Sequence, residues 1–221
     1  MSRRVLSKID STLDVSRHLL TLEQLPCPWD ATLLFGREAP LELEVGSGKG
    51  LYLSNAAAAD SDRDFLGIEI WLKYARFSAV ELAKRQLRNA CVVQGDANRV
   101  LGELLPDASL DAVHIYFPDP WWKTRHSKRR IMNARFLQHV QRTLKAGGQL
   151  HFWTDVQSYF NKSLDVLKQE TDLAGPFEVE RREAEHSMDY RTHFERRTRL
   201  HEEPVYRCTF RKSGNPMTKS Q

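Results

Sequence analysis

The stretch Leu41-Glu-Leu-Glu-Val-Gly-Ser-Gly-Lys-Gly50 decides the fold of this 221-residue chain. Its first five residues predict a short strand, and residues 50–59 have helical composition. Glycines at positions 46, 48 and 50 let the backbone turn sharply and admit a ligand close to the main chain. The stretch therefore predicts a strand, a glycine turn and a helix, with the turn as a place for a ligand.

The alternation of strand and helix continues on the C-terminal side of this stretch. Strands are predicted at 41–45, 65–70, 91–94, 111–117 and 149–153, with two late strands at 177–180 and 205–211. Helices are predicted at 50–59, 71–89, 98–105 and 133–145, and after Val156. Successive strand–helix units need crossover connections. We therefore expect an α/β, Rossmann-like fold with a mainly parallel seven-stranded sheet and helices on both faces.

Composition and charge indicate an ordinary globular protein. Hydrophobic residues make up 41% of the chain, charged residues 28%, and the net charge is +4. No apolar run approaches the roughly 20 residues that cross a bilayer, and no secretory signal is recognisable, so we expect a cytoplasmic protein. The 3 cysteines are too far apart for a metal knuckle. We divide the chain into an N-terminal arm (1–40), one domain (41–211) and a flexible tail (212–221).

Acidic residues lie at the carboxyl ends of the first three predicted strands, where ligands bind in open parallel sheets. They are Glu44, Glu69 and Asp96. Each one alone could be an ordinary helix cap or surface acid. Together they favour a ligand with hydroxyl groups, an amine and a positive charge, a description that S-adenosylmethionine fits. A nicotinamide dinucleotide is a weaker alternative, because Gly50 falls one residue early for the G-x-G-x-x-G pattern.

The fourth strand leads into Phe117-Pro-Asp-Pro-Trp-Trp-Lys123 and then into a basic run that ends at Arg130. Two prolines hold Asp119 on a stiff loop, and the two tryptophans beside it suggest a place for a flat ring. The run from Lys123 to Arg130 has five basic residues in eight and no acid. Such a run is usually a solvated surface, but directly after a candidate reaction centre it favours phosphate binding.

The run F-P-D-P-W-W-K-T-R-H-S-K-R-R (117–130) resembles the signature of the bacterial-type tRNA (guanine-N7-)-methyltransferase family. Four shorter pieces support the resemblance: E-V-G-S-G-K-G (44–50), G-I-E (67–69), T-D (154–155) and T-H-F-E-R (192–196). The match runs in order from about Leu41 to Phe210. The resemblance implies a class I methyltransferase fold and methyl transfer from S-adenosylmethionine to N7 of a guanosine in the tRNA variable loop.

The resemblance also implies roles for particular residues. Cofactor-binding residues would be Glu44, Gly46, Gly48, Glu69, Asp96 and Asp119, and Asp119 would also be catalytic. Substrate-binding residues would be Lys123, Asp155, Thr192, Phe194 and Glu195. RNA-binding residues would be Arg125, His126, Lys128, Arg129 and Arg130. We expect tRNA as the partner, no metal, no membrane, and a monomer or homodimer.

The chemistry of N7 methylation makes modest demands on these residues. Guanine N7 carries an in-plane lone pair and loses no proton, so a general base is not required. We expect Asp119 to act by position and charge, because aligned reactants and a fixed carboxylate both lower the barrier. Two other functions stay open: a related enzyme acting on a small molecule or an exocyclic amine, and an RNA-binding module that has kept the fold without the activity.

Overall fold

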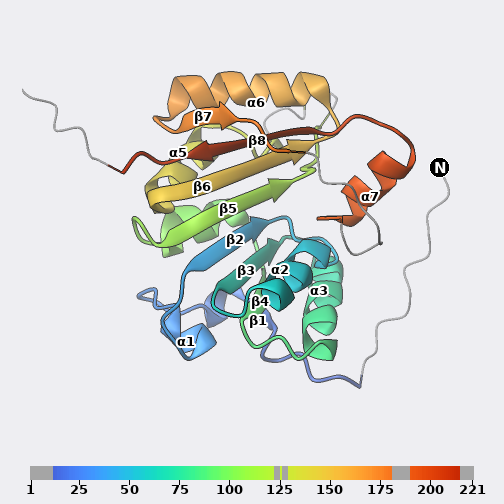
Figure 1. The fold of residues 1–221 in the computed structure, drawn as a ribbon. Coiled ribbons are helices and arrows are strands. Elements are labelled where there is room, and N and C mark those ends of the chain that lie inside the picture. Colours follow the sequence, from blue (N-terminus) through green and yellow to red (C-terminus); the bar gives the residue numbers. More distant parts are fainter. Residues whose placement is uncertain (1–11, 122–124, 126–128, 181–189, 215–221) are drawn as a thin grey trace, which may run out of the picture.

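The computed structural model describes residues 12–121, 125, 129–180 and 190–214. They form an eight-stranded sheet in the order β1-β4-β3-β2-β5-β6-β8-β7 (Figure 1). The strands are β1 (Leu19–Thr21), β2 (Leu41–Val45), β3 (Asp64–Glu69), β4 (Ala90–Gln94), β5 (Leu110–Tyr116), β6 (Leu144–Thr154), β7 (Ala174–Phe177) and β8 (Tyr206–Arg211). The six strands from β1 to β6 run parallel, while β8 is antiparallel to both β6 and β7.

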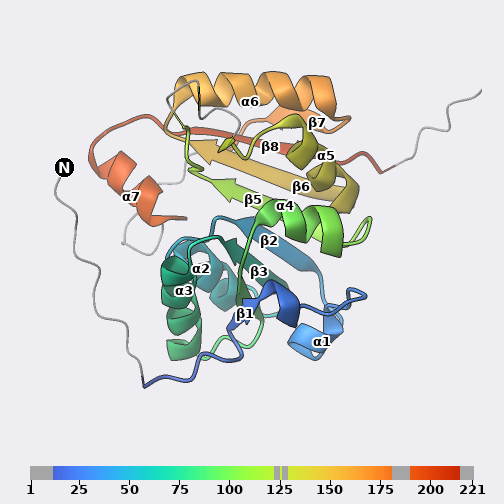
Figure 2. The same cartoon turned by 180° about the vertical axis from the view of Figure 1, so that it is seen from behind.

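Helices connect the parallel strands and cover both faces of the sheet. They are α1 (Thr32–Phe35), α2 (Leu51–Ala59), α3 (Leu72–Lys84), α4 (Ala97–Arg99), α5 (Ala134–Thr143), α6 (Gln157–Glu170) and α7 (His193–Leu200), with a short 3-10 helix η1 (Leu22–Gln24) and a short π-helix η2 (Val100–Leu104). In Figure 1, α2 and α3 lie in front of the sheet. Figure 2 shows α4 and α5 on the opposite face. The α/β, mainly parallel architecture predicted from the sequence is therefore confirmed.

The predicted number of strands was wrong: the sheet has eight strands and not seven. The additional strand is β1, which pairs in parallel with β4 at the edge of the sheet. It lies within residues 1–40, which the sequence analysis treated as an arm. A strand of 3 residues is too short to show periodicity, so its pairing cannot be read from the local pattern.

Several element boundaries also differ from the prediction, and the helix expected at 71–89 already ends at Lys84. The helix expected at 133–145 ends at Thr143, because Leu144 already has an extended backbone with ψ 137° and begins β6. Gly147, expected to stop the helix, takes a positive φ of 79° inside the span of β6. The strand expected at 177–180 is found slightly earlier, as β7. These are shifts of boundary, and the order of elements is unchanged.

Alternate residues of the central strands face two different environments. On the face of α5 and α6, the sheet contributes an aliphatic core that includes Leu43, Val113 and Leu150. On the other face, α2 and α3 pack on a smaller core around Phe65 and Val92. The parallel strands end together at the right-hand edge in Figure 1, where α7 also lies. The strand order reverses at β2, with β3 and β4 on one side of it and β5 and β6 on the other. Ligands of open parallel sheets bind at the carboxyl ends of the strands beside such a reversal, so a ligand is expected at this edge.

Candidate active site at the carboxyl ends of the strands

The glycine turn after β2 needs glycine for both its conformation and its packing. Gly46, Gly48 and Gly50 have φ of 78°, 55° and 77°, in the left-handed region that other residues rarely adopt. A Cβ on Gly50 would lie 2.8 Å from Cα of Ser78, so glycine at this position lets α2 approach α3. The amides of Gly46 and Ser47 donate to the carbonyl of Ile68 and tie the turn to β3. The turn is therefore a rigid, narrow entry to α2.

Glu44 is the most unusual acid at this edge. Its side chain lies at the end of β2, only 3% of the residue is exposed, and its Oε2 atom has no hydrogen-bond partner within the described part of the chain. Burial, and secondly the charge of Glu69, raise the pKa of Glu44 to about 8. An unpartnered buried carboxyl oxygen is costly in a folded protein. Its position beside the glycine turn suits a ligand that donates a hydrogen bond or carries a positive charge.

Glu69 links the end of β3 to the glycine turn. Its Oε2 atom accepts from the amide of Gly48 at 2.9 Å, and its Oε1 atom accepts from the amide of Trp71 at 2.9 Å. Burial raises the pKa of Glu69, and the nearby charge of Asp119 also raises it. The pKa of Glu69 therefore reports the proximity of Asp119, and the pKa of Glu44 reports the proximity of Glu69. Three acids that lie far apart in the sequence share one rim of the sheet.

Asp96 lies on the same rim, after β4. Its Oδ1 atom accepts from the amide of Asn98 at 2.8 Å, so it caps α4. The amide of the preceding Gly95 donates to the carbonyl of Glu69 at 3.0 Å, which places Asp96 next to the end of β3. Asp96 is exposed, and a capping carboxylate keeps further lone pairs for a second partner. The helix-cap interpretation is correct, and it is compatible with ligand binding.

The loop after β5 is held in an unusual conformation. Phe117 is a non-glycine residue with a φ of 50°, and its amide donates to the carbonyl of Trp153 at 2.8 Å. Asp119, two residues later, is exposed at the rim. The Arg130 guanidinium donates to the carbonyl of Pro120 at 2.8 Å and lies 5.4 Å from the ring of Tyr159 in α6. Arg130 thus braces the loop that carries Asp119.

The rest of the predicted basic run is described only in part. Arg129 lies with its guanidinium 5.0 Å from the ring of Trp121, and both Arg125 and Arg129 are exposed. Lys123, His126 and Lys128 lie outside the described residues. RNA binding by this run therefore stays a prediction, and Arg130 has a structural role in addition.

The T-H-F-E-R segment forms the beginning of α7. Thr192 is the N-cap, and its Oγ1 atom accepts from the amide of Glu195 at 3.0 Å. Glu195 is only 3% exposed; its carboxylate accepts from the amide of Arg191 at 2.7 Å and pairs with the guanidinium groups of Arg199 and Arg207 at 3.3 and 3.4 Å. Phe194, in contrast, is 48% exposed. Of the three, Phe194 has the greatest freedom to contact a substrate.

The loop after β5 and the beginning of α7 approach each other through aromatic rings. Phe194 of α7 lies with its ring centroid 6.2 Å from that of Phe117, at an interplanar angle of 21°. Phe117 precedes Asp119 by two residues, so α7 lies beside the acid-bearing loop. Asp155 follows the end of β6 at the same edge of the sheet and is half-buried. The structure therefore brings the described candidate residues to a single edge.

Comparison with known proteins identifies the family. A family model described as "Putative methyltransferase" matches residues 38–208. The chain is 43% identical to a tRNA (guanine-N(7)-)-methyltransferase of Rhodopirellula baltica over 96% of this chain and 80% of that protein. It is 39% identical to the enzyme of the same name from Alkalilimnicola ehrlichii, over 88% of this chain and 83% of that protein. The chain belongs to the tRNA (guanine-N(7)-)-methyltransferase family.

A more distant comparison bears on the fold alone. The crystal structure of the aminoglycoside resistance methyltransferase NpmB1 matches with a TM-score of 0.53 and 19% sequence identity, covering 80% of this chain and 89% of that chain. The similarity agrees with the class I methyltransferase fold expected from the sequence. It says nothing about the substrate of this family member.

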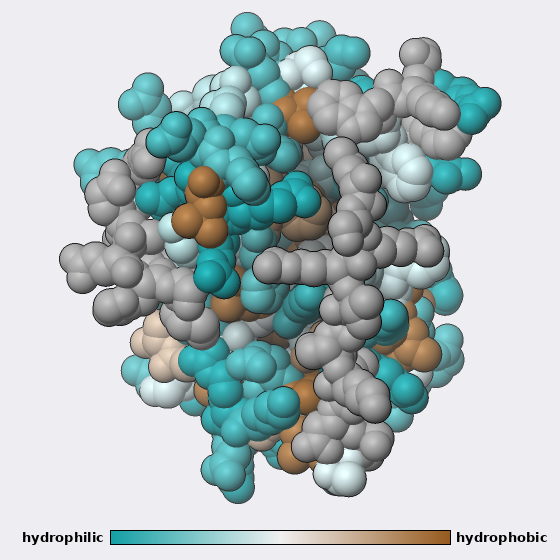
Figure 3. All heavy atoms as spheres, turned by 90° about the vertical axis from the view of Figure 1, so that its right-hand side faces the viewer, coloured by the Kyte–Doolittle hydropathy of each residue, from teal (hydrophilic) through white to brown (hydrophobic). Residues whose placement is uncertain are grey.

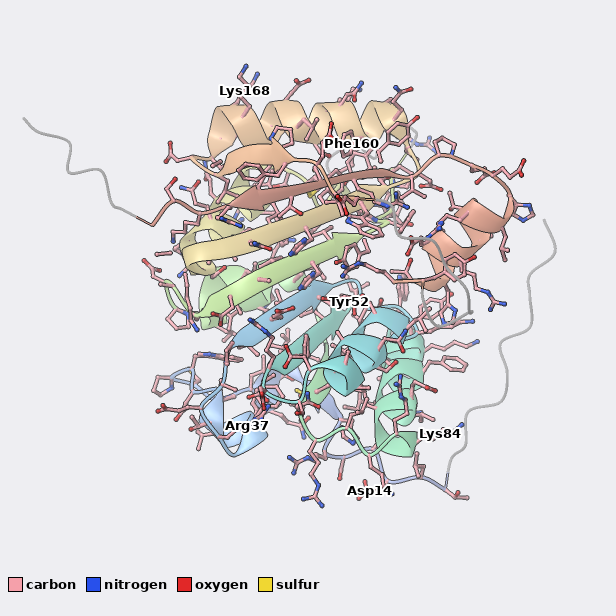
Figure 4. All side chains as sticks on the ribbon, in the orientation of Figure 1. Asp14, Arg37, Tyr52, Lys84, Phe160 and Lys168 are labelled. Atoms are coloured by element: carbon pink, nitrogen blue, oxygen red, sulfur yellow. The ribbon has the colours of Figure 1, made fainter. Side chains whose placement is uncertain are left out.

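A buried polar network that was not predicted from the sequence lies beside the site of this methyltransferase family member. Arg191, one residue before Thr192, lies 5.8, 5.9 and 5.1 Å from the rings of Tyr52, Tyr116 and Trp153. Its Nη1 atom also donates to the Tyr116 hydroxyl at 3.3 Å. Figure 4 labels Tyr52, which reaches from α2 to the sheet. Arg191 therefore fastens the T-H-F-E-R segment to three elements of the fold.

The network continues along the sheet through histidines. His114 Nε2 lies 2.8 Å from a carboxylate oxygen of Glu42, and His114 Nδ1 lies 2.9 Å from the Tyr116 hydroxyl. The His114 ring stacks on that of His151, with centroids 4.7 Å apart. Burial is the main reason why the pKa values of both histidines fall below the usual range, that of His151 to about 2. Both rings are therefore neutral near pH 7.

The start of α7, next to Arg191, does have a signal in the sequence. The Thr-x-x-Glu spacing at 192–195 is typical of a helix N-terminus and could have located it.

A cavity of about 320 Å³ adjoins this network on the side of α2. Its lining includes Glu42, Tyr52, Arg63, Tyr190 and Arg191, and it extends to the C-terminal end of α2, away from the glycine turn.

Within the described ranges, no group of three or more His, Cys, Asp or Glu side chains is arranged to hold a metal ion. No helix among the described residues is long and apolar enough to cross a membrane.

Proposed function

We propose that this chain methylates N7 of a guanosine in the variable loop of tRNA, with S-adenosylmethionine as the methyl donor, in the cytoplasm. The observation that carries the proposal is Glu44: a buried carboxyl with an unpartnered oxygen, beside a glycine turn and a second acid. The names of the relatives that are 43% and 39% identical to this chain over the aligned residues point to the same reaction.

The acids fit a cationic cofactor with ribose hydroxyls and an amine. Glu44 would hold a hydrogen-bond donor next to Gly46 and Gly48, where no side chain blocks the approach to the backbone. Glu69 lies 23 residues beyond Gly46, near the distance at which an acid meets a ribose in related glycine-loop sites. Asp96 keeps lone pairs for a further contact. When bound, S-adenosylmethionine supplies a methyl group on a positively charged sulfur.

The protein's part in the reaction is to position and to stabilise charge. Phe194, half-exposed beside Phe117, would stack on the guanine, while Asp155, Thr192 and Lys123 would orient it. Guanine becomes cationic as N7 is methylated, and the exposed carboxylate of Asp119 would stabilise that charge. Because N7 loses no proton, none of these residues needs to act as a base.

The decisive experiment incubates the full chain with labelled S-adenosylmethionine and unmodified tRNA. Cleavage with borohydride and aniline then reports 7-methylguanosine and its position, and distinguishes it from methylation of an exocyclic amine. We expect cleavage within the variable loop. Label in another base, or no label in tRNA, contradicts the proposal.

Asp119→Asn tests the role of the carboxylate. Turnover should fall by at least about fivefold, since charge stabilisation in a fixed site contributes on the order of 1–4 kcal/mol. Binding of cofactor and tRNA should stay near that of the unmodified protein. Asp165→Asn, an exposed acid on α6, is the matched control. Equal turnover of the two variants removes Asp119 from the mechanism.

A further inference from the structure

We propose that the outward face of α7, together with Lys49, is a second tRNA-binding surface, which contacts the phosphate backbone beside the target guanosine. The inference rests on the proposed function and adds to it, because the sequence had indicated RNA contacts only for the basic run at 125–130. It identifies the residues Arg196, Arg197 and Lys49 as phosphate contacts.

The outward face of α7 is basic because its acid is buried. Arg196 and Arg197 are exposed, whereas Glu195 points inward and is already paired with Arg199 and Arg207. The helix therefore exposes two guanidinium groups to solvent and no carboxylate group. The next acids, Glu202 and Glu203, follow its C-terminal end, away from Phe194. Phosphate groups are the natural partners of such a surface.

A cation from the glycine turn extends this surface. The pKa of His193, the first residue of α7, is lowered by burial and then by the charges of Lys49 and Arg196. Lys49 Nζ lies 5.8 Å from the ring centroid of Phe77 in α3. The negative charge of Glu81, also in α3, acts in the opposite direction and raises the pKa of His193. Cations from two separate elements thus converge on the start of α7, next to the candidate cofactor site.

The same surface has a place for a base. Phe194 is 48% exposed, and the guanidinium of Arg197 lies 4.6 Å from its ring. An exposed aromatic ring with arginine beside it is the combination by which proteins bind single-stranded RNA, through stacking and phosphate contact. Figure 3 looks onto this edge of the molecule and shows mainly hydrophilic side chains with a few hydrophobic ones among them.

The position of α7 relative to the basic run makes RNA the fitting occupant. Arg130 packs on Tyr159 of α6, on one face of the sheet, while α7 meets Lys49 and α3 on the other face. The strand ends, with Asp119, lie between the two. A guanosine entering there would have its flanking phosphates near both basic surfaces. A single surface would contact the chain on one side of the target only.

The test measures tRNA binding by the full chain as a function of salt concentration. Each phosphate contact contributes roughly 0.7 to 0.9 to the slope of log affinity against log salt. For the Arg196→Ala/Arg197→Ala variant we expect a slope that is flatter by roughly 1.4 to 1.8, and a raised KM for tRNA. Affinity for S-adenosylmethionine should be unchanged. Arg196→Lys/Arg197→Lys should restore most of the slope, because the charges remain.

The matched control is Lys168→Ala/Arg211→Ala, which removes two exposed cations from α6 and β8, away from α7. Its slope should equal that of the unmodified protein. An alanine variant of α7 with an unchanged slope, or a control variant with the same loss, overturns the inference. Since binding is measured apart from methylation, this failure is distinct from failure of the proposed function, which would be absence of 7-methylguanosine with the unmodified protein.

Discussion

The two faces of the central strands are built from alternate residues of the same sequence, and they differ in kind. On the face of α5 and α6, Val113 and Ile115 of β5 and Phe152 of β6 are fully buried among aliphatic and aromatic side chains. On the other face, His114 and His151 alternate with them and join Glu42 and Arg191 in a polar network. The difference separates two tasks within one sheet.

The aliphatic face stabilises the fold as a whole, and the polar face attaches the beginning of α7 to α2, β5 and β6. Charged and hydrogen-bonded groups have strict geometry, so the network can fix the beginning of α7 relative to β5 in a way that aliphatic packing alone does not. The cost is sensitivity to pH, because buried ionisable groups with shifted pKa values couple folding to protonation.

The largest effect should come from the aliphatic face. Phe136 of α5 is fully buried there, and Phe136→Ala should lower the free energy of unfolding by about 3–5 kcal/mol, through lost burial and a new cavity. Urea unfolding at several pH values measures both the loss and its pH dependence. We expect the same loss at pH 5 and pH 8. A loss that changes with pH would show that the two faces are coupled.

The fold was predictable from the sequence where local patterns repeat. Five strand–helix units, their order and the glycine turn were all visible, because each has its own periodicity or turn residues. β1 was not, since its 3 residues gain their stability from pairing with β4. Likewise, Leu144 belongs to β6 although it continues the apolar stripe of α5. In both cases a tertiary contact decided what the local pattern left open.

The next effect concerns Glu44, on the polar face. Its pKa is raised from 4.5 to about 8, so the native state keeps a proton that the unfolded chain releases above pH 4.5. Its contribution to stability is therefore complete below pH 4.5 and is lost as pH rises towards 8, by about 1.4 kcal/mol per pH unit. Glu44→Gln cannot ionise and should remove this decline when cofactor is absent.

The measurement for Glu44→Gln is the free energy of unfolding between pH 5 and pH 8, combined with calorimetric titration of S-adenosylmethionine. We expect the variant to be more stable than the unmodified protein at pH 8 and to bind the cofactor more weakly. A functional site commonly exchanges stability for binding in this way. Equal stability of the two proteins across the pH range would mean that Glu44 is ionised at little cost.

A smaller effect is expected at Arg191, which joins the polar face to α7. Arg191→Ala removes a cation from the rings of Tyr52, Tyr116 and Trp153 and should cost about 2 kcal/mol of unfolding free energy. Because the T-H-F-E-R segment loses its attachment, KM for tRNA should rise more than kcat falls. Arg191→Lys keeps the cation and should recover much of both. Recovery of stability without recovery of KM would disprove the positioning role.

Only those site residues that belong to a sequence motif or to the end of a predicted strand could be predicted. The four acids were located by the ends of their strands, and the structure places them on one rim. Arg191 carries no such signal, since its partners come from α2, β5 and β6 and only the fold brings them together. Glu195 shows the converse: the motif marked it as a substrate residue, while its buried carboxylate is occupied by Arg199 and Arg207.

The smallest effect should come from His151, as a change in how the free energy of unfolding depends on pH. Burial, then the neighbouring His114 and Arg191, lower its pKa from 6.5 to about 2, so the native ring stays neutral while the unfolded chain takes up a proton below pH 6.5. Stability is therefore lost as pH falls below 6.5, by at most about 1.4 kcal/mol per pH unit. This trend has the opposite sign to that of Glu44.

His151→Gln isolates this contribution when it is placed in the Glu44→Gln background, which removes the opposing trend. The glutamine amide can still meet the Thr209 hydroxyl, now 3.1 Å from His151 Nδ1, so packing changes little. Urea unfolding at pH 6.5 and pH 5 should show a smaller loss on acidification in the double variant than in Glu44→Gln alone. His114 also has a lowered pKa and will keep part of the loss. Identical losses in the two variants would mean that the stacked histidine pair takes up protons without unfolding, and that the polar face tolerates charge as readily as solvent does.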